Sequence, residues 1–296
     1  MRTVPDCLIC ILGDVYAAAQ QVSEPKTALA VARAASDYLA ANFDYELPPS
    51  YHITQVHRIL KQQAELVEPF ADRRRKTNDV GMEIAQKVAR EAAEIGNLPG
   101  RLRYLALWAL AANSLDSRTA GTGYAFDPAG AYDYLFGYFQ RDPARDELDA
   151  LVQYVAGGPR VLYIHDNVGE LALDALLVRE LRDSGCHVTS AVRGGPITSD
   201  ATWNDALYVG LDSAASVLIL AGPDTLGISF AEMSPQLTSE LGRADLVIAK
   251  GQANYYVLSE FRNQIPGRVF AMFTVKCQAV ARVLGVETRS AVCAFL

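Results

Sequence analysis

The strongest structural signal in this chain is the run Val161-Leu162-Tyr163-Ile164-His165-Asp166-Asn167-Val168-Gly169-Glu170. Its apolar start predicts a buried strand, and the helical spacing of leucines over residues 171–181 predicts an amphipathic helix directly after it. A strand, a sharp polar turn and a helix form half of a βαβ unit. Ligands of open α/β sheets bind at the carboxyl ends of the strands, so we expect Asp166 and Asn167 to lie at a ligand-binding edge.

The same alternation continues to the end of the chain. The expected strands are residues 161–165, 187–192, 215–221, 245–249 and 267–275, with a further candidate at 289–296. The expected helices lie near residues 170–184, 201–211, 229–242, 251–263 and 276–284. Repeated strand–helix units predict an α/β fold with a mostly parallel sheet that is covered by helices on both faces.

The first half of the chain shows helical patterns without strands. The expected helices begin near Pro5, Pro25, Ser50, Pro69, Leu102 and Asp142. The last of them ends at the glycine and proline cluster of residues 157–159, which is also the place where the pattern changes. We therefore predict an all-helical N-terminal domain over residues 1–156 and an α/β domain over residues 157–296. A helical part of this kind can also wrap the sheet rather than stand apart from it.

Composition and charge limit the classes of function. The chain has 296 residues and a formal net charge of −7, which disfavours nucleic acid and anionic membranes as partners. It contains no apolar run of the roughly 20 residues that a membrane span needs, and Pro5 and Asp6 interrupt any signal peptide. Its five cysteines are few and odd in number, which favours a reducing compartment. We expect a soluble, cytoplasmic protein, and the sequence makes no prediction of its oligomeric state.

Polar side chains at the expected strand ends have the chemistry of a cation and anion site. Asp166, Asn167 and Asp200 offer oxygen ligands of the kind that Mg²⁺ and Mn²⁺ prefer, without the histidines of a zinc site. Lys250 and Lys276 end later strands and add positive charge, and the helix start after the first strand adds N–H groups for a phosphate. These parts suit phosphoryl transfer, which needs positioning and charge neutralisation.

Each of these residues also has an ordinary structural explanation. Asp200 suits a helix cap, Glu170 complements a helix dipole, and a lysine at a strand end is commonly solvated. Asn113 and Asp116 follow a buried helix and equally fit capping and turn positions. His165, inside an apolar strand, is expected to be a hydrogen-bonded core residue. The chain has no glycine-rich phosphate loop, no nucleophile elbow and no H-E-x-x-H motif, so the residues alone predict a metal and anion site and no specific reaction.

A family resemblance runs through the same residues. It rests on Cys7-Leu8-Ile9-Cys10, Glu68-Pro69-Phe70, Lys76-Thr77-Asn78, Asn113-Ser114-Leu115-Asp116, Asp166-Asn167-Val168-Gly169-Glu170, Ser199-Asp200-Ala201-Thr202, Lys250-Gly251-Gln252-Ala253-Asn254 and Lys276-Cys277. In this order the segments resemble the damage-control phosphatase family, which are metal-dependent phosphatases formerly filed as a domain of unknown function. The N-terminal cysteine pair resembles the compact microbial branch of that family. The resemblance implies a helical N-terminal part on a Rossmann-like α/β part.

The resemblance also implies an activity and a set of site residues. The implied reaction is hydrolysis of phosphate monoesters of small metabolites, such as sugar phosphates or damaged phosphorylated metabolites. The implied metal ligands are Asp166, Asn167 and Asp200, holding Mg²⁺ or Mn²⁺, with Co²⁺ or Ni²⁺ as alternatives. The implied substrate-binding residues are Asn113, Asp116, Glu170, Lys250, Asn254 and Lys276. Asp166, Lys276, Glu170 and Asp116 are the catalytic candidates, and either of the last two would handle a proton or position the water.

Departures from the family pattern leave two other functions open. Ala112 and Ala253 stand in place of glycine, Tyr256 in place of glutamate and Ile228 in place of a hydroxyl residue. A methyl group can close a pocket where the backbone must approach a ligand, so a non-catalytic protein that binds metal and a phosphorylated ligand is one alternative. A redox or metal sensor built on Cys7, Cys10 and Cys277 is the other.

Overall fold

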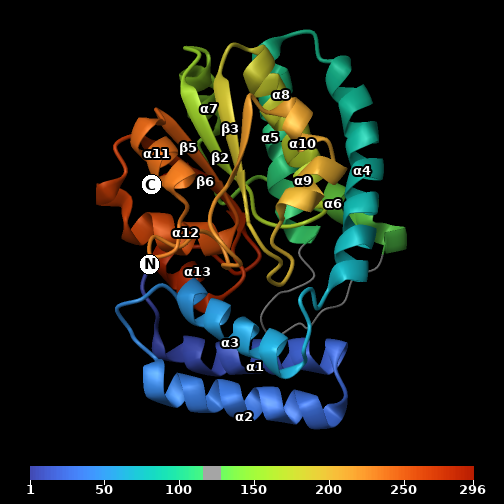
Figure 1. Ribbon diagram of the computed structural model, residues 1–296. Coiled ribbons are helices and arrows are strands. Elements are labelled where there is room, and N and C mark those ends of the chain that lie inside the picture. Colours follow the sequence, from blue (N-terminus) through green and yellow to red (C-terminus); the bar gives the residue numbers. More distant parts are fainter. Residues whose placement is uncertain (116–127) are drawn as a thin grey trace.

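The computed structural model describes residues 1–115 and 128–296, and a seven-stranded sheet lies at the centre of that part of the chain (Figure 1). The strands are β1 (Arg145–Asp146), β2 (Arg160–Ile164), β3 (His187–Val192), β4 (Val217–Leu220), β5 (Leu246–Lys250), β6 (Arg268–Thr274) and β7 (Ala291–Phe295). Their order across the sheet is β1-β7-β6-β5-β2-β3-β4. Every neighbouring pair is parallel except β6 and β7. The predicted α/β fold with a mostly parallel sheet is confirmed.

Helices cover both faces of the sheet, as the sequence predicts. They are α4 (Ala71–Ala93), α5 (Leu98–Ala112), α6 (Ala131–Phe139), α7 (Leu148–Val155), α8 (Glu170–Asp183), α9 (Trp203–Tyr208), α10 (Leu211–Ala214), α11 (Pro235–Arg243), α12 (Gln252–Glu260) and α13 (Gln278–Leu284). Three short 3₁₀ helices among the described residues are η1 (Asn113–Leu115), η2 (Pro128–Gly130) and η3 (Arg262–Gln264). Alternate residues of β2 point to opposite faces: Tyr163 joins the core under α5 and α8, and Leu162 joins the core under α11 and α12.

Three N-terminal helices form a separate layer across one edge of the sheet (Figure 1). They are α1 (Pro5–Val22), α2 (Pro25–Asn42) and α3 (Pro49–Gln63). Each begins with proline in its first turn, where the missing N–H costs no helical hydrogen bond. Ser50 therefore lies inside the first turn of α3 and does not cap it. Buried residues such as Val15, Val31 and Val56 give this layer a core of its own.

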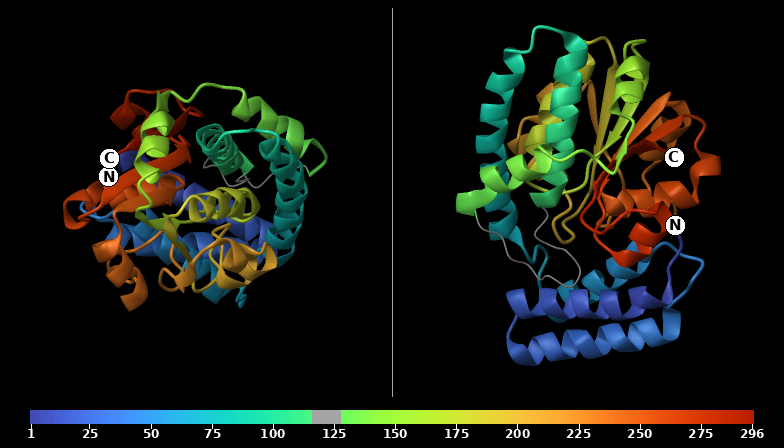
Figure 2. Two further views of the ribbon diagram at one scale, coloured as in Figure 1. Left: turned by 90° about the horizontal axis from the view of Figure 1, so that it is seen from above. Right: turned by 180° about the vertical axis from the view of Figure 1, so that it is seen from behind.

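The hydrophobic core of the sheet extends across residue 157. Ile84 of α4 and Leu105 of α5 belong to the same buried cluster as Leu177 of α8 and Val188 of β3. Figure 2 shows α4 and α5 packed alongside the sheet, and α1 to α3 set apart from it. A division at residue 157 therefore cuts through one core, and we propose that the change of packing lies near residue 66, after α3.

Two details of the fold were not expected. The segment after Asp142 does not start a helix at once, because Arg145 and Asp146 first pair with Val292 and Cys293 of β7 as a short parallel strand. The last strand runs antiparallel to β6, a direction that its own sequence does not specify. Within residues 1–115 and 128–296, every helix is too short or too polar to cross a bilayer.

The strand order places a switch point between β2 and β5. The chain proceeds from β2 to β3 and β4 on one side, and it returns to the other side of β2 with β5 and then β6. Crossover helices therefore leave the carboxyl ends of β2 and β5 in opposite directions, which opens a crevice there. Asp166 follows β2 at this crevice, and Gly251 follows β5.

Candidate functional site

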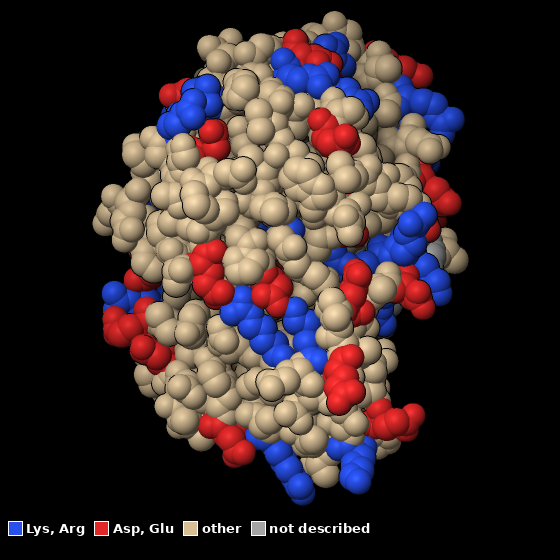
Figure 3. All heavy atoms as spheres, in the orientation of Figure 1, with Lys and Arg blue, Asp and Glu red and all other residues tan. Residues whose placement is uncertain are grey.

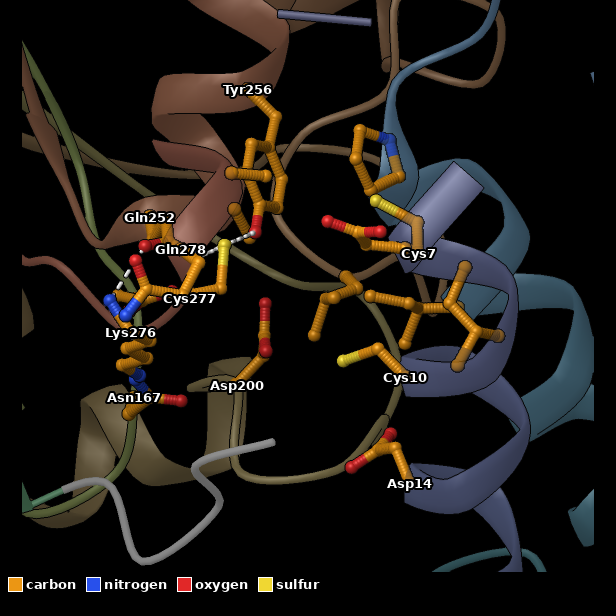
Figure 4. A pocket seen from close by; sticks show the side chains of 18 residues that line it. Cys7, Cys10, Asp14, Asn167, Asp200, Gln252, Tyr256, Lys276, Cys277 and Gln278 are labelled. Carbon is orange, nitrogen blue, oxygen red and sulfur yellow. Dashed lines mark hydrogen bonds between the residues drawn. The ribbon is translucent and has the colours of Figure 1, made fainter. Parts of the chain in front are cut away.

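A cavity of about 170 Å³ lies at this switch point, with α1 forming the opposite wall (Figure 4). Asp166, Asn167, Asp200 and Lys276 line it from the sheet side. Cys7, Cys10 and Asp14 line it from α1. Segments that are far apart in the sequence therefore meet here, and the three side chains expected to bind a cation share one cavity.

Asp166 and Asn167 form the turn after β2, and neighbouring side chains fix their orientation. Oδ2 of Asp166 accepts hydrogen bonds from Nδ2 of Asn113 at 3.0 Å and from Nδ2 of Asn167 at 2.7 Å. Oδ1 of Asn167 accepts a hydrogen bond from the hydroxyl of Ser199 at 2.7 Å. Both residues are nearly buried although they line the cavity, so they have little freedom to turn away from it.

Glu170 begins α8 and supports this turn from behind. Its carboxylate accepts hydrogen bonds from the amide of Asn167 at 2.9 Å, Nδ2 of Asn113 at 3.0 Å and Nζ of Lys250 at 2.6 Å. Lys250 also donates to Asp174 at 2.6 Å. Burial lowers the pKa of Lys250, but Asp174 and Glu170 outweigh it and raise the pKa above its ordinary value. The ammonium group therefore stays charged.

The positions of Lys250 and Glu170 differ from the expectation that they contact substrate. Both are fully buried, and neither is among the described residues that line the cavity. The carboxylate of Glu170 is already occupied by hydrogen bonds from three residues. These two residues act on the site through Asn113 and Asn167.

His165 is the hydrogen-bonded core residue that the sequence predicts. Its Nδ1 lies 3.0 Å from Asp174, and its Nε2 lies 3.0 Å from the hydroxyl of Ser190. Burial lowers the pKa of His165, and the neighbouring Asp174 only partly offsets this effect. Burial raises the pKa of Asp174, but Lys250 and His165 outweigh it, so that pKa lies below its ordinary value.

Asp200 reaches the site from the segment that follows β3. A single antiparallel bridge pairs its backbone with that of Asn167. Oδ2 of Asp200 accepts hydrogen bonds from Nε of Arg193 at 3.0 Å and from the amide of Gly227 at 2.8 Å. Arg74 donates to the carbonyl of Asp200 at 2.8 Å and forms an ion pair with Asp205, which holds the whole segment against α4.

Gly251 gives the carboxylate of Asp166 its space. Its φ of +81° favours glycine, and a Cβ atom there would lie 1.8 Å from Oδ2 of Asp166. The glycine after β5 therefore allows the side chain after β2 to cross the switch point and reach the cavity.

Two further residues that were expected to bind substrate, Asn113 and Asn254, are buried and hydrogen-bonded to protein groups. Asn113 bridges Asp166, Glu170 and the amide of Thr274, and it is fully buried. Asn254 is also buried: it accepts a hydrogen bond from the amide of Ile228 and donates to the carbonyls of Lys250 and His165. Asp116 lies outside the described residues.

The start of α8 binds its own protein groups. The amides of Val168 and Gly169 donate to Ser199 and to Asn78, at 2.8 Å and 2.9 Å. These two amides, which directly precede α8, are therefore not available to a phosphate, and no residue of α8 is among the described residues that line the cavity. Residues Gln252 and Ala253, at the start of α12, line the cavity instead.

Arg193, Tyr256 and Asp14 lie at the site, although none of them was assigned a site role from the sequence; Tyr256 was noted only as a departure from the family pattern. Tyr256 lines the cavity, and burial together with Cys277 raises its pKa, so its hydroxyl keeps its proton. Asp14 lies 2.9 Å from Nε2 of His57, a buried residue of α3. Arg193 directly follows β3, where its position at a strand end was the available signal.

The donor set fits a hard divalent cation. It consists of the two carboxylates of Asp166 and Asp200 and the amide of Asn167, all oxygen-bearing and on one cavity. Within residues 1–115 and 128–296, no three His, Cys, Asp or Glu side chains converge as a metal cluster. The proposed set contains only two carboxylates, because its third ligand is the side-chain amide of Asn167, which such a cluster does not count.

Comparisons with known proteins agree with this fold. A protein of Methanocaldococcus jannaschii without a known function is 30% identical over 97% of this chain and 93% of its own length. A damage-control phosphatase of Archaeoglobus fulgidus is 28% identical over 97% of this chain and 96% of its own length. The crystal structure of a DUF89 family protein from Pyrococcus horikoshii superposes with a TM-score of 0.85 at 25% identity, covering 99% of this chain and 98% of the other. The family model described as the damage-control phosphatase ARMT1-like domain matches residues 3–292, and the chain therefore belongs to this family.

Proposed function

We propose that this protein is a metal-dependent phosphatase that hydrolyses phosphate monoesters of small metabolites, among them sugar phosphates and damaged phosphorylated metabolites. The observation that carries the proposal is the meeting of Asp166, Asn167, Asp200 and Lys276 on one cavity at the switch point of the sheet. Family membership and the relative from Archaeoglobus fulgidus that is named a damage-control phosphatase support it.

The charge of the cavity favours a cation-dependent reaction. Its described lining contains four aspartates and one lysine, so a phosphate dianion would meet net negative charge. Asp6 is paired with Arg282 at 2.6 Å near the surface, and Asp200 is paired with Arg193 at 3.0 Å behind the cavity. The four aspartates still outnumber these two arginines and Lys276. We assign Mg²⁺ or Mn²⁺ to Asp166, Asn167 and Asp200, with Co²⁺ or Ni²⁺ as substitutes. When bound, such an ion polarises a phosphoryl oxygen and acidifies water.

The other residues divide into those that touch the substrate and those that hold the site. Lys276 lines the cavity and supplies a point charge for phosphate oxygens, and the start of α12 adds the partial positive charge of a helix N-terminus. Asn113, Glu170 and Lys250 hold the Asp166–Asn167 turn without reaching the cavity. Asp116, three residues after the anchored Asn113, is the proposed residue for positioning water or moving a proton.

Phosphate release from a generic aryl phosphate tests this proposal. The metal-free protein should be inactive, and added Mn²⁺ or Mg²⁺ should restore turnover. Asp166→Ala should lose activity at every metal concentration, because it removes a ligand at the centre of the site. Turnover that is unaffected by chelation, or an active Asp166→Ala variant, contradicts the mechanism. Binding of metal and phosphorylated ligands with no turnover on a broad metabolite panel would favour the non-catalytic alternative.

A further inference from the structure

Arg193 is a fully buried basic residue whose guanidinium touches the candidate cation site from behind. It follows β3 directly, and its Nε donates to Oδ2 of Asp200 at 3.0 Å. Its Nη2 donates to the carbonyl of His165 at 3.2 Å and lies 3.4 Å from Oδ1 of Asn254. The planar group is thus held between the ends of β2 and β3 and the start of α12.

The two oxygens of the Asp200 carboxylate have different surroundings. Oδ2 accepts hydrogen bonds from both Arg193 and the amide of Gly227. Oδ1 has only a long contact with the hydroxyl of Thr198, at 3.4 Å, among the residues that the structure describes. Asp200 lines the cavity, and its carboxylate points into the space between the sheet side and α1 (Figure 4). Arg193 and Gly227 therefore occupy one oxygen and leave the other for a ligand.

The partners of Arg193 are themselves fixed. Oδ1 of Asn254 also accepts the amide of Ile228 at 2.9 Å, and its Nδ2 donates to the carbonyl of Lys250 at 2.7 Å. Asn254 therefore cannot rotate without losing contacts on two loops. The hydrogen bonds of Asn254 thus fix the plane of the Arg193 guanidinium, and the guanidinium in turn orients the carboxylate of Asp200.

Stability alone does not explain an arginine at this position. Its Nη1 is buried and lacks a hydrogen-bond partner within the described part of the chain. An unsatisfied buried donor destabilises the folded state, and a buried ion pair is commonly no more stabilising than apolar residues of similar volume. The hydrogen bond from Arg193 to Asp200 therefore needs an explanation other than stability.

We propose that Arg193 is a positioning residue for the divalent cation: its fork holds Oδ2 of Asp200 so that Oδ1 faces the cavity as a metal ligand. This inference rests on the proposed cation site and goes beyond it, because it names the residue that sets one ligand's geometry. It assigns the effect to the fork shape of arginine and not to its charge. A lysine has the charge but cannot donate to Asp200, His165 and Asn254 in one plane.

The test measures Mn²⁺ affinity of the metal-free full chain by titration calorimetry in Arg193→Lys and Arg193→Met. Loss of a residue that orients a ligand commonly lowers metal affinity about 10- to 100-fold, and we expect both variants to fall in this range. Arg101→Met is the matched control, since Arg101 pairs with Glu180 at 2.9 Å and does not line the cavity. It should bind Mn²⁺ like the wild type. Wild-type affinity in Arg193→Lys would overturn the inference.

A second arm separates positioning from a general structural effect. In an Asp200→Asn background, Arg193→Lys should lower the remaining Mn²⁺ affinity by less than about twofold, because residues that act through one another are not additive. An undiminished loss in that background would show that Arg193 acts elsewhere and would overturn the inference. Urea unfolding of each metal-free variant confirms that folded proteins are compared, and the lysine variant carries the test if the methionine variant does not fold. If the wild-type protein binds no Mn²⁺, the result contradicts the proposed function and, with it, the role of Arg193.

Discussion

The two walls of the cavity are held in place by different kinds of ion pair. On the sheet side, Arg193 and Lys250 have fully buried side chains and pair with buried carboxylates. On the side of α1 to α3, Arg58 is 27% exposed and pairs with Asp224 at 2.8 Å, as Lys61 also does. Figure 3 shows acidic and basic side chains interspersed on the surface where the two parts meet.

This difference separates a fixed wall, which is the sheet side of the cavity, from an adjustable wall, which is the side of α1 to α3. Removing one partner of a buried pair costs about 3–5 kcal/mol, because a charge is left without compensation. Partly exposed pairs contribute up to about 1 kcal/mol and weaken in salt. The candidate cation ligands lie on the wall whose geometry is strongly determined, and the thiols of Cys7 and Cys10 lie on the wall that is held more weakly.

The largest effect should come from Lys250→Met. This change leaves Glu170 and Asp174 buried without their cation, so the free energy of unfolding should fall by about 3–5 kcal/mol in urea titrations. Lys61→Met, at the adjustable wall, is the control and should cost less than about 1 kcal/mol. A similar loss of unfolding free energy in the two variants would show that the two walls are held equally strongly.

A second substitution acts on geometry at the fixed wall. Gly251→Ala places a Cβ atom against the carboxylate of Asp166, and we expect kcat/KM to fall about 100-fold or more, the size of effect that a displacement near 1 Å produces. Gly185→Ala is the control, because Gly185 also has a positive φ, +100°, but has no described atom within 4 Å of its Cβ position. An equal fall in kcat/KM in the two variants would show that the strain of a positive φ, and not the contact with Asp166, lowers the activity.

The smallest effect concerns the adjustable wall and its pH dependence. Burial raises the pKa of Asp224, but Lys61 and Arg58 outweigh it and leave the pKa below its ordinary value. Such a group adds stability above its unfolded pKa of about 4, and this stability is lost as the pH falls through the folded value. The Tm of the wild type should therefore drop more than that of Asp224→Asn between about pH 5 and pH 3. Parallel curves would show that these pairs do not hold the helical layer.

Local patterns were sufficient to predict the parallel strands β2 to β6 and the meeting of Asp166, Asn167 and Asp200. A strand is recognised from its own apolar residues, and the edge rule for parallel sheets brings residues that follow different strands together. The layer of α1 to α3 was not predicted as a separate unit, because the helical pattern of α4 and α5 gives no sign that their apolar faces pack on the sheet.

Burial of the charged residues was the main feature that the sequence could not provide. Glu170 and Lys250 were expected at the substrate because the family resemblance implies it, but the two residues pair with each other across 80 residues of the chain. Nothing in the local sequence shows that these side chains face each other. The pairing of Arg193 with Asp200 is hidden in the same way, although both residues lie in one short segment.

The proposed cation site can be checked directly by locating a bound Mn²⁺ ion by anomalous diffraction from crystals grown with manganese. We expect a single strong peak within coordination distance of Asp166, Asn167 and Oδ1 of Asp200. Manganese bound elsewhere, with ordered water or protein groups in this place, would contradict the proposed site.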